Sequence, residues 1–131
     1  MKKTWELTLS EGINKIQNQS LSATDWAESL LERIDLVEKK IHAWATLNKE
    51  GALAEAKEID DNLEFDLPLR GAPIGIKDII NVKHLPCEAN SPLLKGNIPK
   101  EDAHCISKIK DAGAIIIGKT VTTQFATGDP S

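Results

Sequence analysis

Residues 69–78 read LRGAPIGIKD, and this stretch decides the fold because a short apolar run carries a lysine at its far end. A second apolar run, GAIIIGKT, follows at residues 113–120. Nearly continuous apolar runs of this length are typical of parallel strands that are covered on both faces. We therefore predict strands over Pro73–Lys77 and Ala114–Gly118.

A helix is predicted between these two strands. The segment Glu101–Ala112 places Ala103, Ile106 and Ile109 on one side, and Gly113 follows as a helix-ending glycine. Strand, helix and strand at this spacing form a βαβ unit, which is expected to have a right-handed crossover.

The residues before position 64 have the character of helices. Thr8 and Glu11 fit a capping box that begins a first short helix, which Gly12 weakens. Ser22 is a good N-cap for a second helix, with Asp25 at its third position.

The second helix has an apolar stripe at three- and four-residue steps, formed by Trp26, Leu30, Ile34, Val37 and Ile41. Such a stripe favours a helix packed on the protein core over one bound to a membrane or a partner helix.

A short strand at Ala43–Leu47 and a third helix over Lys49–Leu63 complete this part. The fold class is therefore α/β, with N-terminal helices followed by a βαβ unit of a mixed sheet. We expect one domain over residues 1–131, with a helical layer in 1–64 and the βαβ part in 65–131.

Composition excludes several classes of function. The chain has 131 residues, a net charge of −4, 40% apolar and 27% charged residues, which is ordinary for a soluble globular domain. The negative charge argues against a nucleic-acid partner. No run reaches the length of a membrane span, so a cytoplasmic protein is expected, with Cys87 and Cys105 as free thiols.

Residues 113–120 also match the phosphate-binding pattern G-x-x-x-x-G-K-[ST]. That pattern requires a flexible loop entered from a strand. Here the middle residues are Ala114 and three isoleucines, which favour the strand itself. We therefore reject nucleotide binding.

Four metal-capable side chains occur, at His84, Cys87, His104 and Cys105. Neighbours on a helix point about 100° apart, so His104 and Cys105 would converge poorly on one ion. We expect no metal and no cofactor, with Cys105 in the core and His104 exposed.

Lys77 and Asp78 have two interpretations. They could be a surface ion pair at a strand end, which spacing alone favours. Alternatively, Lys77 could be buried as a proton acceptor, because burial penalises the charged ammonium form.

Several separated motifs, in this order, resemble the N-terminal part of the amidase signature family. The similarity covers residues 20 to 131, and its motifs are Leu30–Ile34, Ala52–Lys57, Leu69–Val82, Leu85–Pro86, Ser91–Leu94, Glu101–Ala103, Ile109–Thr120 and Gln124–Ala126.

The resemblance implies a mixed α/β sheet and hydrolysis of a carboxamide C–N bond by a Ser–Ser–Lys triad. One serine attacks the carbonyl, a second relays a proton, and the lysine is the base. By motif position Lys77 is that lysine. Backbone N–H groups of the family's Gly/Ser-rich loop would form the oxyanion hole.

The sequence departs from the family at its missing segment and at residues 88–91, and residues 119–125 distinguish between members of the family. The Gly/Ser-rich segment that carries both serines lies beyond Ser131, and neither Ser91 nor Ser107 occupies a matching position. Residues 119–125 look closer to stand-alone amidases than to the A subunit of the tRNA-dependent amidotransferase. Residues 88–91 lack the usual small-residue and threonine pattern.

We therefore expect an N-terminal fragment of an amidase of small carboxamides that is inactive alone. The alternative is a non-catalytic binding or assembly module. Because a partial sheet leaves an open edge and an uncovered apolar face, we expect a homo-oligomer.

Overall fold

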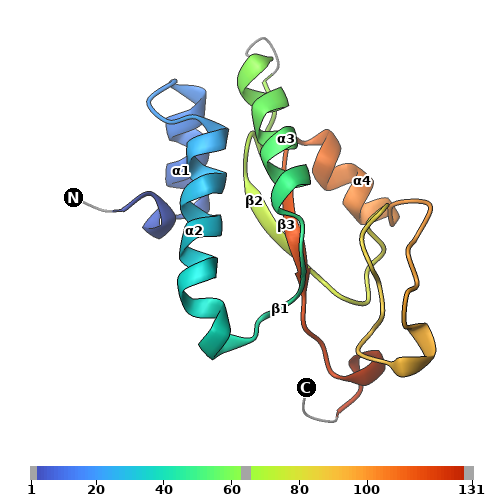
Figure 1. Ribbon diagram of the computed structural model, residues 1–131. Helices are drawn as coiled ribbons and strands as arrows, with labels where there is room; N and C mark the ends of the chain where they lie inside the picture. Colours follow the sequence, from blue (N-terminus) through green and yellow to red (C-terminus); the bar gives the residue numbers. More distant parts are fainter. Residues whose placement is uncertain (1–2, 63–65, 129–131) are drawn as a thin grey trace.

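The computed structural model describes residues 3–62 and 66–128, and these form a mixed α/β fold (Figure 1). Its elements, in order, are η1 (Thr4–Glu6), α1 (Leu9–Gln17), α2 (Ala23–Ile41), β1 (Trp44–Leu47), α3 (Lys49–Asp61), β2 (Pro73–Lys77), η2 (Pro92–Leu94), α4 (His104–Asp111), β3 (Ile115–Thr120) and η3 (Gln124–Ala126). The predicted fold class is confirmed. The expected end of the third helix at Leu63 lies outside the described residues.

The three strands of the described chain form one sheet in the order β1-β3-β2. β2 runs parallel to β3, with Lys77 opposite Thr120, as the predicted βαβ unit requires. β1 pairs antiparallel with the other side of β3, with Trp44 also opposite Thr120. The mixed sheet therefore places β3 at its centre.

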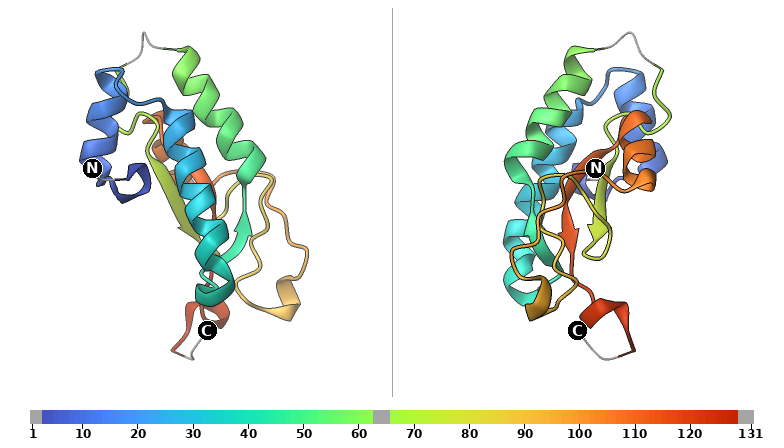
Figure 2. Two further views of the ribbon diagram at one scale, coloured as in Figure 1. Left: turned by 60° about the vertical axis from the view of Figure 1, so that its left-hand side comes forward. Right: turned by 90° about the vertical axis from the view of Figure 1, so that its right-hand side faces the viewer.

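Helices cover both faces of this sheet (Figure 2). One core cluster joins α1, α2 and α3 to Ile115 and Ile117 of β3. A second cluster joins Ile106 of α4 to Ile76 and Ile116 on the opposite face. Alternate residues of β3 thus face opposite layers, as the pleat of a strand requires.

The predicted starts of the first two helices are confirmed. The Thr8 hydroxyl accepts a hydrogen bond from the Glu11 N–H, and the Glu11 carboxylate accepts one from the Thr8 N–H. The Ser22 hydroxyl likewise accepts from the Asp25 N–H. The apolar stripe of α2 is buried or half-buried up to Val37, whereas Ile41 is 60% exposed at the end of the helix.

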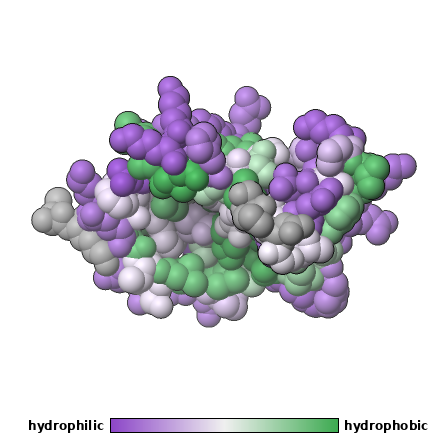
Figure 3. All heavy atoms as spheres, turned by 90° about the horizontal axis from the view of Figure 1, so that it is seen from below, coloured by the Kyte–Doolittle hydropathy of each residue, from purple (hydrophilic) through white to green (hydrophobic). Residues whose placement is uncertain are grey.

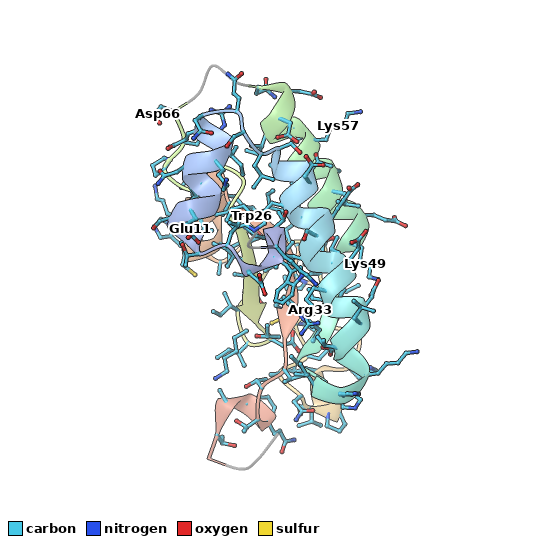
Figure 4. All side chains as sticks on the ribbon, turned by 90° about the vertical axis from the view of Figure 1, so that its left-hand side faces the viewer. Glu11, Trp26, Arg33, Lys49, Lys57 and Asp66 are labelled. Carbon is cyan, nitrogen blue, oxygen red and sulfur yellow. The ribbon has the colours of Figure 1, made fainter. Side chains whose placement is uncertain are left out.

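Gly12 allows α1 and α2 to approach closely. It is buried, and a Cβ atom at this position would overlap the ring of Trp26, which Figure 4 shows between the two helices. The residue that weakens α1 as an isolated helix therefore permits its packing against α2.

Two side chains, one from the residue that precedes α3 and one from α3 itself, take the place of a strand partner beside Ile116. The Asn48 amide donates to the Ile116 carbonyl, and a Glu55 carboxylate oxygen accepts from the Ile116 N–H at 3.0 Å. These bonds satisfy backbone groups of β3 beyond the reach of the short strand β1.

The start of α4 and the end of β3 differ from expectation. α4 begins at His104 rather than Glu101, because the Ala103 N–H donates to the Asn81 carbonyl and the Asp102 carboxylate accepts from the Lys83 N–H. These tertiary bonds hold residues 102–103 outside the helix.

β3 extends to Thr120, two residues beyond the predicted end, and includes a fully buried lysine. As predicted, residues 115–118 are strand rather than phosphate-binding loop. No helix within the described ranges is long and apolar enough to cross a membrane.

Candidate functional site

Lys77 is the last residue of β2 and its side chain is exposed. Within the described parts of the chain, this side chain makes no hydrogen bond or ion pair. In this structure Lys77 is exposed, as the surface alternative expected, and not buried. The ion pair with Asp78 that this alternative also expected is wrong, because the Asp78 carboxylate pairs with Lys119. The backbone at this point is well held, since the Lys77 carbonyl accepts from the N–H groups of Ile79 and Ile80.

The buried lysine at this end of the sheet is Lys119. Its side chain is 0% exposed, and its ammonium group donates to Asp78 Oδ1 at 2.9 Å and to the Pro86 carbonyl at 3.0 Å. The pairing of β2 with β3 shifts register between Ile74 and Gly75, which interrupts the alternation along β3 and places Lys119 opposite Ile76. The Lys119 side chain therefore extends toward the layer that contains α4 and the long loop after β2.

Asp78 uses both its side chain and its backbone to hold that loop. Its Oδ2 accepts from the Glu88 N–H at 3.2 Å and its carbonyl accepts from the Ala89 N–H at 3.0 Å. Its own N–H donates to the Thr120 carbonyl at 2.9 Å, which continues the pairing of β2 with β3.

The held segment, residues 86–91, is called here the 86–91 loop, and it contains unusual backbone conformations. Ala89 and Asn90 have φ angles of 49° and 51°, which cost energy in residues other than glycine. Ser91 is buried, and its hydroxyl accepts from the Gln124 side-chain amide at 3.3 Å. The Phe125 N–H donates to the Ala89 carbonyl, so η3 is attached to the same loop.

These segments meet at the carboxyl ends of the parallel strands, where ligand sites of α/β proteins commonly form. Figure 3 views the molecule from below, and apolar and polar side chains intermingle on this face. A cleft of about 280 Å³ is lined by residues that include Asp78, Glu88, Asn90 and Thr122. Lys77 is not part of its lining.

The histidine and cysteine side chains that the sequence offered as metal ligands do not form a common site within the described residues. Within the described ranges, no group of three or more His, Cys, Asp or Glu side chains could hold a metal ion. His104 is exposed as expected, but Cys105 is also exposed, so its assignment to the core is wrong. Cys87 is the buried thiol, and both cysteines are free.

The pairing of Lys119 with Asp78 was missed by sequence reasoning. A signal was present, because Lys119 interrupts an apolar strand run and Asp78 directly follows the neighbouring strand. Parallel neighbours bring their carboxyl ends together, so a lysine and a carboxylate at those ends are candidates for pairing.

Residues 25–129 match the sequence profile of the Amidase family, and the chain belongs to that family. It is 38% identical over 125 residues to the A subunit of a glutamyl-tRNA(Gln) amidotransferase from Streptomyces avermitilis, covering 93% of this chain and 25% of that protein. The chain thus spans about a quarter of the length of this curated relative.

Solved structures of the family have the same fold. The peptide amidase from Stenotrophomonas maltophilia superposes with a TM-score of 0.83 at 30% identity, covering 92% of this chain and 26% of that one. A fatty acid amide hydrolase gives a TM-score of 0.86 at 23% identity over 92% of this chain and 22% of that one, a likeness of fold alone. Because relatives of both kinds match, the preference for stand-alone amidases over the amidotransferase is not supported.

Proposed function

We propose that this chain contributes the lysine base of an amide-hydrolysing site, and that Lys77 is this lysine. The observation that carries the proposal is the position of Lys77. It is held on a fixed backbone at the carboxyl end of β2, with its amine unpaired within the described residues, in the region that matches the Amidase family. The ammonium group of Lys119, by contrast, is already engaged by the Asp78 carboxylate and the Pro86 carbonyl.

The reaction in this proposal is hydrolysis of the C–N bond of a small carboxamide. A serine hydroxyl attacks the carbonyl carbon, its proton passes through a second serine to Lys77, and the amine leaves with a proton returned along the same route. A water molecule then attacks the acyl-serine ester, which releases the carboxylic acid and restores the serine hydroxyl. Neither Ser91 nor Ser107 makes a hydrogen bond to Lys77 in the described structure. Both serines would therefore come from a longer protein.

The first test reads the gene beyond the codon for Ser131. We expect a Gly/Ser-rich coding segment, and expression of the longer protein should release ammonia from small carboxamides. Lys77→Met should abolish this release, whereas the 131-residue chain alone should release none. A stop codon directly after Ser131 would contradict the catalytic proposal, as would activity that survives Lys77→Met.

An assembly module is the second candidate, favoured by an open sheet edge. Within the described residues β2 pairs only with β3, and several large apolar side chains are exposed, among them Leu93 at 85% and Leu36 at 75%. We propose that the isolated chain forms homo-oligomers through such surfaces. Light scattering over a wide concentration range should then give a mass above that of one chain, and a constant monomer mass would exclude this.

The location of the protein stays a prediction. Free thiols at Cys87 and Cys105 accord with the reducing cytoplasm expected from the sequence.

A further inference from the structure

We infer that Lys119 is a positioning residue for Lys77, acting through Asp78 and the 86–91 loop. This inference rests on the proposed function of Lys77. The Lys119–Asp78 ion pair then fixes the position of the end of β2 and of the 86–91 loop.

The first step of the argument is that Asp78 is fully engaged. Its N–H, its carbonyl and both carboxylate oxygens all have hydrogen-bond partners, which lie in β3 and in the 86–91 loop. Asp78 is the residue directly after Lys77, so the Lys77 backbone cannot shift without disturbing these bonds.

The second step is that Lys119 connects the two segments that Asp78 holds. The Lys119 ammonium group donates to both the Asp78 carboxylate and the Pro86 carbonyl. It thereby joins the end of β2 to the start of the loop, whereas the Glu88 N–H joins the same carboxylate to the middle of the loop.

The third step concerns what the loop holds in turn. Ala89 and Asn90 keep positive φ angles, and such conformations persist only where surrounding contacts fix them. The Ala89 N–H is bound by Asp78, and the Ala89 carbonyl is bound by Phe125 of η3. Removing the Lys119–Asp78 ion pair should therefore loosen the loop and the surroundings of Lys77.

The chain contains a reporter for this loosening. Cys87 lies between Pro86 and Glu88 and is only 5% exposed, whereas Cys105 is exposed on α4. Reaction with a maleimide in the folded chain should be slow at Cys87 and fast at Cys105, since a buried thiol reacts only when its segment opens.

The test uses the double variant Lys119→Met/Asp78→Asn in the 131-residue chain, which leaves no unpaired buried charge. We expect Cys87 to react at least about tenfold faster than in the wild type, with Cys105 changed by less than about twofold. The matched control is Lys110→Met/Asp102→Asn, because that lysine–aspartate pair has the same separation of 2.9 Å but makes no side-chain hydrogen bond to the 86–91 loop within the described residues. The control should leave the Cys87 rate unchanged.

A spectroscopic readout follows Lys77 itself. Reductive ¹³C-methylation labels exposed lysines, and Lys77→Arg identifies the Lys77 signal in a ¹H–¹³C spectrum. The signal should shift or broaden in Lys119→Met/Asp78→Asn and stay in place in the control. A purely structural ion pair would change the denaturation midpoint without moving this signal.

A folded double variant with a protected Cys87 and an unmoved Lys77 signal overturns the inference. If far-UV circular dichroism shows that the double variant is unfolded, Asp78→Glu replaces it with the same criteria, because it keeps a carboxylate for Lys119 but displaces that carboxylate by one methylene group. Failure of both to fold also overturns the inference, because the pair would then support the whole fold. None of these outcomes depends on amide hydrolysis, so they are distinct from failure of the proposed function.

Discussion

The ammonium group of Lys119 lies 2.9 Å from the Asp78 carboxylate, and the two side chains are 0% and 6% exposed. Burying both charges is costly, and their attraction offsets that cost only while both are present. The pair joins two strand ends and a loop, so its loss should lower the free energy of unfolding as well as loosen the 86–91 loop.

Lys119→Met should lower the free energy of unfolding by about 3–5 kcal/mol, because it leaves the Asp78 carboxylate buried without its partner. Lys119→Met/Asp78→Asn should lose less, since no charge is then buried alone. Urea denaturation followed by circular dichroism measures both. Equal losses in the two variants would show that the uncompensated charge is not the cause.

Lys77→Met should change the free energy of unfolding by less than about 0.5 kcal/mol, because the side chain is exposed and makes no bond within the described residues. The same urea experiment tests this. A loss comparable to that of Lys119→Met would indicate that Lys77 stabilises the fold, which would weaken the case that it is kept for chemistry.

Glu55 should give stability a pH dependence. Burial raises the pKa of its carboxyl group, and the hydrogen bond from the Ile116 N–H offsets only part of this rise. The folded chain therefore holds this proton more tightly than the unfolded chain does. Its stabilising contribution is complete below the ordinary pKa of a glutamate and is lost as pH rises through the folded pKa.

Glu55→Gln removes the titration and keeps an acceptor for the Ile116 N–H. The stability of this variant relative to the wild type should therefore rise between about pH 4 and pH 7. Denaturation at several pH values measures the difference, with Glu58→Gln, an exposed charge-matched change on α3, as the control. A difference that stays constant with pH, or falls, would refute the assignment.

Gly12→Ala should destabilise the chain although alanine favours helices. The added methyl group would overlap the buried Trp26 ring, and overpacking of this kind costs about 1–3 kcal/mol. Asn14→Ala, on an exposed position of the same helix, controls for helix propensity and should be neutral or stabilising. A stabilised Gly12→Ala would mean that the helices can separate at little cost.

The helices were predictable where a local signal decides their start. Thr8 and Ser22 cap α1 and α2 through bonds within three residues, which a sequence reveals directly. The start of α4 was not predictable, because it is set by Asn81 and Lys83, some twenty residues earlier in the chain.

The candidate site was predictable in part. The location of Lys77 at the end of a strand followed from its apolar run, but its exposure did not, since burial depends on what covers a strand. The burial of Lys119 could not be predicted for a related reason. A charged residue satisfied by a distant carboxylate can occupy a core position without disturbing the strand. Cys105 was placed in the core from its residue type, yet its position on α4 faces solvent.

The tryptophans occupy three separate places in this fold. Trp5 lies in η1 under the Arg33 guanidinium, Trp26 is packed between α1 and α2, and Trp44 begins the edge strand β1. Their emission would therefore report on different regions during refolding. Variants that keep a single tryptophan would show by their fluorescence how fast the helices pack and how fast the strands pair during refolding. Comparison of these rates would establish which part forms first.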